Sequence, residues 1–146
     1  MGNLNTSKDQ IISKTTNFLR NKEEIELSYI FGSFVNKDHY HDIDIAVYLN
    51  GEFNQINPLK YPYGYESSLI GELSLLLKEN IDVIVMNYAG LLIQQRVVNK
   101  GILLFSRDER FRIRYENTIR KQYIDAAHLR NIKRYYLKKA LDNARY

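Results

Sequence analysis

Residues 31–49 read FGSFVNKDHYHDIDIAVYL, and this stretch decides how the rest of the chain is interpreted. A β-rich segment, IELSYIF, ends at Phe31, where Gly32 and Ser33 interrupt it. After a spacer of eight residues, the pattern DIDIAVYL begins at Asp42. We expect strands over residues 25–31 and 42–49, because both are short runs rich in β-branched and aromatic residues.

The second predicted strand carries two carboxylates close together. Its isoleucine and valine residues alternate with Asp44 and Ala46, which predicts a strand with one buried face. Asp42 and Asp44 are two residues apart, so their side chains point to the same side of a strand. Adjacent carboxylates repel each other unless a cation lies between them, and Mg²⁺ prefers hard oxygen ligands. We therefore expect a magnesium site on this face.

Three further residues complete the predicted site. Gly32 lets the backbone approach an anion closely, and Ser33 lies where a helical turn would begin and present free N–H groups to phosphate. Asp82 opens another apolar segment, IDVIVM. If this segment pairs with the strand that carries Asp44, Asp82 reaches the same metal or acts as a general base. Each feature alone also has a purely structural explanation, as a turn, an exposed strand edge or a capping residue.

The remaining pattern predicts helices around a small sheet. Ser7, with Gln10 three residues on, forms a capping box for a first helix, and Ser67 or Ser68 is expected to cap a helix with a leucine stripe. Gly101 lies just past the end of a third helix, as helix-ending glycines do. The predicted helices cover residues 7–22, 68–80, 89–99 and 108–146 (the last as one helix or two), and the third and fourth strands cover residues 81–86 and 102–105.

This order of elements predicts an α/β (α+β) fold with a mixed sheet of about four strands packed by helices. The length of 146 residues suits a single domain, 1–146, with a catalytic core over about residues 8–106 and a helical segment over about residues 108–146. The tyrosine-rich stretch KYPYGYE, residues 60–66, is expected to pack on the sheet, and stacking on a base is the alternative.

Composition limits the possible classes of protein. The absence of cysteine excludes disulfides, thiolate nucleophiles and Cys-type zinc sites. No apolar run approaches the ~20 residues of a membrane helix, so we expect a cytoplasmic protein without a membrane partner. Residues 107–146 hold 12 Lys or Arg against 5 Asp or Glu. This basic segment is a solvated helix face or a surface for a protein partner, and direct nucleic-acid binding is the least favoured explanation.

The set Gly32-Ser33, a short spacer, Asp42-x-Asp44 and a later strand Asp82 resembles the signature of the minimal nucleotidyltransferases of the polymerase-β-like superfamily, over about residues 8–106. Among these, the chain most resembles the MntA-like antitoxins of HEPN/MNT toxin–antitoxin systems. That likeness rests on small size, on the segment VVNKGILLFSRDERFRIRYENTIRKQYID and on the long basic and aromatic C-terminal helix. The spacer is shorter than in many antitoxin-type members.

The resemblance implies that Asp42, Asp44 and Asp82 hold two Mg²⁺ ions and that Gly32 and Ser33 bind the phosphates of ATP. It also implies transfer of AMP from ATP to a tyrosine hydroxyl of a partner HEPN toxin, which silences the ribonuclease activity of that toxin. Two alternatives stay open: a nucleotidyltransferase for a small molecule such as an aminoglycoside, and a non-catalytic antitoxin that acts by binding. The short chain leaves little room for an acceptor-binding domain, which favours a protein acceptor.

Overall fold

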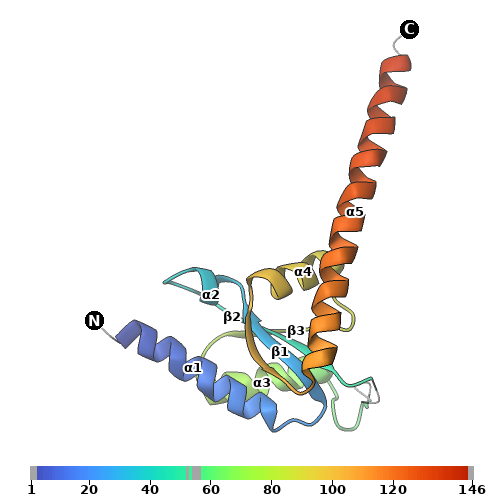
Figure 1. Cartoon of the computed structure of the whole chain (residues 1–146). Helices are drawn as coiled ribbons and strands as arrows, with labels where there is room; N and C mark the ends of the chain where they lie inside the picture. The colour runs from blue at the N-terminus through green and yellow to red at the C-terminus, as the bar shows by residue number, and fades with distance from the viewer. Residues whose placement is uncertain (1–2, 52, 54–56, 145–146) are drawn as a thin grey trace.

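The computed structural model describes residues 3–51, 53 and 57–144, and Figure 1 shows their arrangement. Helices and strands alternate along the chain in the predicted order. The elements are α1 (Asn3–Arg20), β1 (Ile25–Phe31), α2 (Ser33–Asn36), β2 (Ile43–Leu49), α3 (Tyr65–Leu77), β3 (Ile81–Val85), α4 (Leu91–Lys100), β4 (Ile102–Ser106) and α5 (Glu109–Asn143).

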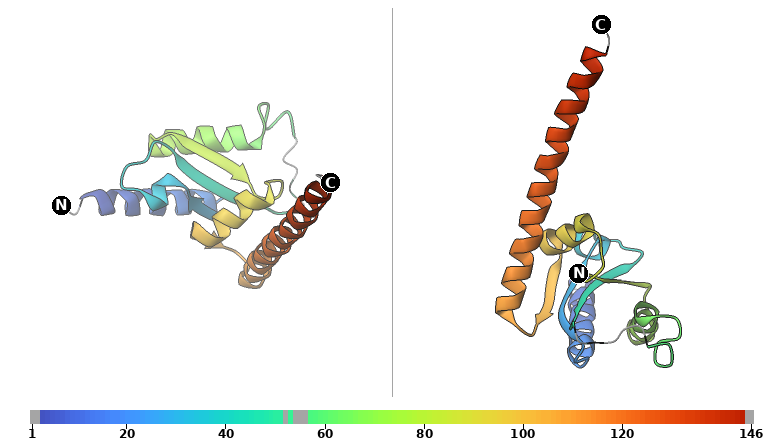
Figure 2. Two further views of the ribbon diagram at one scale, coloured as in Figure 1. Left: turned by 90° about the horizontal axis from the view of Figure 1, so that it is seen from above. Right: turned by 90° about the vertical axis from the view of Figure 1, so that its right-hand side faces the viewer.

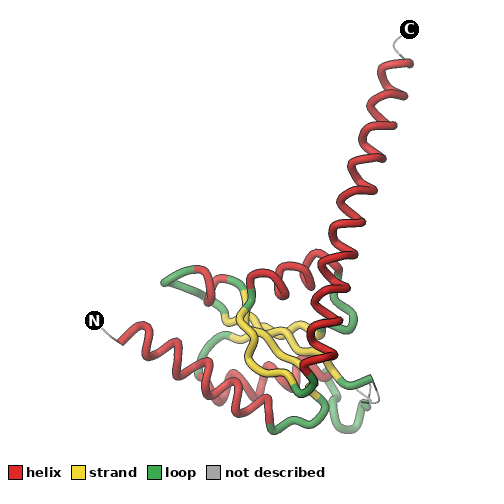
Figure 3. Tube along the Cα trace, in the orientation of Figure 1, coloured by secondary structure: helices red, strands yellow, loops and turns green. Residues whose placement is uncertain are grey.

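The four strands form one mixed sheet in the order β3-β2-β1-β4. β1 pairs antiparallel with β2 and with β4, whereas β2 and β3 run parallel. In Figure 3 the strands lie at the centre of the molecule with helices around them. The predicted mixed sheet of about four strands is therefore confirmed, and the parallel pair arises because α3 carries the chain back between β2 and β3.

Helices cover both faces of the sheet. On one face, α1 and α3 pack on the side of β2 that carries Ile43, Ile45 and Val47. On the other face, Ala46 of β2 is buried in a second cluster that includes Val97 of α4 and packs against the start of α5. Figure 2 shows these helices on the two sides. The prediction that this strand has one buried face is therefore wrong, because α4 and α5 cover the second face.

Two helices begin earlier than predicted. α1 begins at Asn3, so Ser7 lies inside the helix and does not cap it. No Gly or Pro stands between Asn3 and Ser7, so nothing in the sequence stops the helix there. α3 begins at Tyr65, with Gly64 as its N-cap, so neither Ser67 nor Ser68 caps it.

Aromatic packing explains the early start of α3. The Tyr65 ring is buried and meets Tyr61 and Phe53 edge-on, with centroids 5.2 Å apart in each case. Its hydroxyl donates to Glu24 at 3.1 Å. These contacts fix the first residue of α3. The leucine stripe predicted for this helix consists of Leu69, Leu73, Leu76 and Leu77. It is partly wrong, because Leu76 stays 41% exposed.

Gly101 closes α4 in a different way from the expected one. Its φ is −75°, so it does not use the left-handed conformation of a typical helix-ending glycine. A Cβ atom at this position would lie 2.5 Å from the Val97 carbonyl oxygen and 3.2 Å from the Ile30 carbonyl oxygen. Glycine is needed here because the chain passes close to β1 as it turns from α4 into β4.

α5 is one helix of 35 residues that is packed only at its beginning. The Asp108 side chain caps it by accepting from the backbone N–H groups of Arg110 and Phe111. Glu116 then accepts a buried hydrogen bond from the Tyr29 hydroxyl of β1, and its carboxylate pairs with Arg112. These contacts attach the first third of α5 to the sheet.

The rest of α5 extends away from the domain, as Figure 1 shows. Between residues 121 and 144, where the structure describes the chain, no residue is buried, and every residue from His128 to Ala144 is exposed. We call residues 121–143 the α5 extension. Across the described ranges, no helix has the length and apolar character that crossing a membrane requires.

Candidate active site

The site begins where β1 ends. Phe31, the last residue of β1, pairs with Asp44 of β2, so the next residue, Gly32, lies against the Asp44 side chain. Gly32 has a φ of +78°, a conformation that favours glycine. A Cβ atom on Gly32 would lie 2.1 Å from Oδ2 of Asp44, which is closer than such atoms can approach. Gly32 is therefore needed both for its backbone angle and for the space that the Asp44 carboxylate occupies.

Asp82 lies directly beside Asp44. The backbone N–H of Ile43 donates to the Asn80 carbonyl at 2.8 Å, and from there β2 and β3 pair in parallel with Asp44 opposite Asp82. Partners in a parallel pair point to the same face of the sheet. The strand adjacency on which the role of Asp82 depends is therefore confirmed.

Asp42 lies just outside the ladder, because β2 begins at Ile43 and not at Asp42 as predicted. Its charge still acts on Asp44. Burial raises the pKa of Asp44, and the negative charges of Asp82 and then Asp42 raise it further. Asp44 is half-buried, whereas Asp42 and Asp82 are exposed. The three carboxylates thus form a negative cluster that opens to solvent at one end of the sheet.

The cluster is not arranged as a finished metal centre. In the part of the chain that the structure describes, no three His, Asp or Glu side chains converge in a geometry that could hold a metal ion. The structure brings the predicted ligands to one place, and their use as ligands remains a prediction.

α2 follows Gly32 directly. Ser33 is its first residue, and the first helical hydrogen bond is donated by Val35 to the Gly32 carbonyl at 3.1 Å. The N–H groups of Ser33 and Phe34 therefore precede the helical ladder, at the end of a helix where anions are favoured. All five predicted site residues lie at this corner of β1, β2 and β3.

Sequence reasoning missed Lys8, which contacts this corner from α1. The Lys8 ammonium donates to the carbonyl oxygens of Phe34 and Lys37, both at 2.7 Å. No signal in the sequence pointed to this contact, because Lys8 and Phe34 are 26 residues apart and a lysine near the start of a helix is ordinary.

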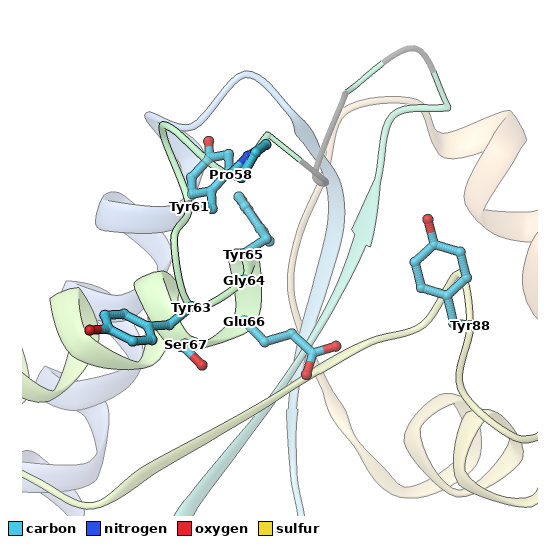
Figure 4. A pocket seen from close by; sticks show the side chains of 8 residues that line it. All are labelled: Pro58, Tyr61, Tyr63, Gly64, Tyr65, Glu66, Ser67 and Tyr88. Atoms are coloured by element: carbon cyan, nitrogen blue, oxygen red, sulfur yellow. The ribbon is translucent and has the colours of Figure 1, made fainter.

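A cavity of about 480 Å³ lies elsewhere, between the tyrosine-rich loop, the start of α3 and Tyr88 (Figure 4). None of the five predicted site residues lines it. Tyr88 follows the C-terminal end of β3, whereas Asp82 lies near the beginning of that strand. Tyr61 and Tyr65 are buried in the cluster that contains strand residues, which confirms that the loop packs on the sheet. Of the three tyrosines of the loop, Tyr63 is the exposed one, at 88%.

Comparison with known proteins identifies the fold. A chain of a toxin–antitoxin crystal structure with AMP-PNP is similar to this one, with 21% identity, a TM-score of 0.65 and coverage of 89% of this chain and 98% of that one. A chain from the complex of tri-AMPylated Shewanella oneidensis HEPN toxin with MNT antitoxin has 21% identity and a TM-score of 0.64, and the match covers 92% and 98% of the two chains. A chain of the toxin–antitoxin MntA-HepT has 19% identity and a TM-score of 0.63, with coverage of 91% and 98%.

At these identities the likeness establishes the fold, and it confirms the predicted α+β architecture. A search among curated protein sequences finds no significant match. The family model described as polymerase beta, nucleotidyltransferase matches residues 13–110, which include β1 to β4 and all five predicted site residues. The chain therefore belongs to the polymerase-β nucleotidyltransferase family.

Proposed function

We propose that the chain is a single nucleotidyltransferase domain and a cytoplasmic antitoxin, which transfers AMP from ATP to a tyrosine hydroxyl of a HEPN toxin and so neutralises its ribonuclease activity. In this proposal Asp42, Asp44 and Asp82 are the metal ligands, and Gly32 and Ser33 bind the triphosphate. The observation that carries the proposal is the pairing of Asp44 with Asp82 across β2 and β3, next to a glycine that leaves room for the Asp44 carboxylate.

The residues present fit magnesium. Asp82 and Asp42 both raise the pKa of Asp44 through their charge, after the larger effect of burial, so negative charge is concentrated here. Carboxylate oxygens are the ligands that Mg²⁺ shares with substrate phosphates, and exposure on one side leaves room for a nucleotide. When bound, the metal would neutralise the developing negative charge on the phosphate oxygens and orient the triphosphate.

The protein's own groups would have separate roles in the transfer. The N–H groups at the start of α2 would hold the β- and γ-phosphates, which places the α-phosphorus over the carboxylates. The acceptor oxygen then forms a bond to the α-phosphorus, and the bond to the bridging oxygen of the β-phosphate breaks, so pyrophosphate leaves with that electron pair. Asp82 would accept the phenolic proton and release it to solvent, to which this side chain is exposed.

The α5 extension supports a protein acceptor. Leu129, Ile132 and Tyr136 lie on one face of the helix and are 65%, 39% and 63% exposed. Six Lys or Arg residues and two Asp residues share residues 121–143 with them. An uncovered apolar stripe among positive charges fits an acidic partner with an apolar groove. The similar toxin–antitoxin complexes, one of them with an AMPylated HEPN toxin, support the same assignment.

A second candidate, inhibition by binding alone, is favoured by the same extension. A helix with this much uncovered apolar surface would bind a partner without any chemistry. The two functions differ in what the carboxylates do, because binding alone needs none of them.

One experiment separates the two functions. The chain is co-expressed with a HEPN toxin, and intact-mass spectrometry of the toxin looks for added AMP. The proposal expects one or more AMP additions with the native chain and none with the Asp42→Asn/Asp44→Asn variant, which also fails to protect cells. If the variant protects as well as the native chain, neutralisation is by binding and the enzymatic proposal is wrong.

A further inference from the structure

We infer that Lys8 is a positioning residue for the nucleotide site. Its side chain holds the segment between Ser33 and Asp42 in place, and so sets the position of the phosphate-binding turn at Gly32 and Ser33. The inference rests on the proposed function, in which that turn binds ATP. It concerns a residue that lies outside the Gly-Ser and Asp-x-Asp motifs and outside the residues 13–110 matched by the family model.

The hydrogen bonds of Lys8 lie at the C-terminal end of α2. α2 has only four residues, so few backbone N–H groups of the helix can donate hydrogen bonds to the carbonyl groups of Phe34 and Lys37. The Lys8 ammonium donates to both at 2.7 Å and offers a positive charge to the negative end of the helix dipole. These charge-assisted bonds are stronger than ordinary ones.

Two aromatic rings complete the attachment. The Lys8 Nζ atom lies 5.2 Å from the ring centroid of Phe34 and 5.7 Å from that of Tyr40. The two rings pack edge-to-face with centroids 4.8 Å apart, and Phe34 is buried. Phe34 directly follows Ser33, and Tyr40 stands two residues before Asp42. One ammonium group therefore contacts both ends of the segment that connects the phosphate-binding turn to the carboxylates.

This placement indicates that Lys8 acts through the turn. Two of its three N–H donors are used by backbone carbonyls, which are on the opposite end of α2 from the N–H groups of Ser33 and Phe34. Loss of the ammonium would free α2 to move, and the N–H groups at its start would no longer be preorganised for phosphate. Nucleotide affinity should fall although no group that touches the nucleotide has changed.

The test compares three variants of the full chain. Lys8→Met keeps the length of the side chain and removes its charge, whereas Lys8→Arg keeps donors that can serve two carbonyls and stack on the rings. Lys14→Met is the matched control, since Lys14 lies on the same helix and is exposed. The measurements are calorimetric binding of AMP-PNP with Mg²⁺ and hydrogen exchange of the amides of residues 33–37.

We expect Lys8→Met to weaken AMP-PNP binding about tenfold and to speed amide exchange in α2 by about tenfold, as the loss of a charge-assisted anchor predicts. Exchange in β1 and β2 and the Tm should stay unchanged, Lys14→Met should behave as wild type, and Lys8→Arg should recover most of the affinity. For AMP transfer, KM for ATP should rise more than kcat falls.

Two results would count against the inference in different ways. If Lys8→Met binds AMP-PNP as tightly as wild type, or if α2 exchanges at the wild-type rate, Lys8 does not position the turn, and the proposed function is unaffected. If the wild-type chain itself binds no AMP-PNP in the presence of Mg²⁺, the proposed function is wrong and the role of Lys8 at a nucleotide site is lost with it.

Discussion

The carboxylate corner of the sheet and the α5 extension differ in how fully this chain determines them. The corner is held from several sides, by strand pairing of Asp44 with Asp82, by the close approach of Gly32 and by the anchor from Lys8. The extension has only its own helical hydrogen bonds and leaves its apolar stripe uncovered. On the proposed function, the chain itself holds the groups for chemistry, whereas the apolar stripe of the extension would be covered only by a partner.

The largest expected effect separates chemistry from binding. Asp44→Asn should lower AMP transfer by about a thousandfold or more, because a metal ligand worth several kcal/mol in the transition state is lost. Partner binding should stay unchanged, because the α5 extension is intact. Single-turnover transfer from labelled ATP measures the first effect, and calorimetry with the HEPN toxin measures the second.

Asp38→Asn is the control for this substitution, because it removes the same charge from an exposed residue of the neighbouring loop. It should transfer AMP at the wild-type rate. Equal loss in both variants would mean that the general charge of this surface, and not Asp44, matters.

The next effect tests the steric fit at the corner. Gly32→Ala requires a positive φ from alanine and a Cβ atom that collides with Asp44 Oδ2, so we expect about 2–3 kcal/mol of lost stability or about a hundredfold slower transfer. Gly64→Ala is a matched control, because Gly64 has a φ of +92° and no atom within 4 Å of an added Cβ. The excess loss in Gly32→Ala, measured by urea unfolding and transfer rate, isolates the collision. If both variants lose the same stability and transfer rate, the Asp44 side chain moves aside without cost and the collision does not matter.

A smaller effect is expected at the extension. Replacing both Leu129 and Tyr136 by Glu should weaken toxin binding by about 2 kcal/mol, roughly thirtyfold, because charges enter the apolar stripe. The Tm and AMP-PNP affinity should not change, since both side chains are exposed. Asn131→Glu, on the opposite side of the helix, is the control. If the double variant binds the toxin with wild-type affinity, the toxin does not bind the apolar stripe of the α5 extension.

The smallest expected effect is on the free energy of unfolding, which the repulsion among Asp42, Asp44 and Asp82 lowers. Because burial, Asp82 and Asp42 raise the pKa of Asp44, the folded chain binds a proton there more tightly than the unfolded chain does. Stability therefore falls as pH rises through the window from the ordinary carboxyl pKa to the raised one. Without metal at neutral pH, Asp44→Asn should be more stable than wild type by about 0.5–1 kcal/mol after solvent screening.

Thermal unfolding with a chelator measures this difference. Below the ordinary carboxyl pKa the two proteins should unfold alike, since Asp44 is then protonated in both states. A wild-type chain that is the more stable one at neutral pH without metal would contradict the idea of uncompensated charge at the corner.

Much of the fold was predictable because its strands are short and strongly patterned. β1 matches the predicted range, and β3 and β4 differ from it by a single residue at one end. Helix starts were less predictable, since Ser7 and Ser67 have the composition of caps but the chain begins each helix earlier. Tertiary contacts of Tyr65 decide the start of α3, and such contacts have no local signal.

The residues of the candidate site could be proposed from the sequence, whereas their arrangement in space could be foreseen only in part. Spacing alone placed Asp42 near Asp44, and Asp82 was a candidate because it opens a separate apolar segment, IDVIVM. The parallel pairing that brings Asp82 to Asp44 depends on the path of α3, which periodicity does not specify. The role of Lys8 could not be predicted, because its partners are carbonyl groups and aromatic rings far along the chain.

The parallel pairing of β2 with β3 also bears on when activity can appear as the protein is made. β1 and β2 are joined by a short connection and can pair early, whereas Asp82 lies 38 residues after Asp44 and reaches it only after α3 has crossed over. Because chains emerge N-terminus first, a nascent chain that has formed the first hairpin holds two of the three carboxylates. The candidate site is thus assembled late in folding, and an incomplete chain would be chemically silent.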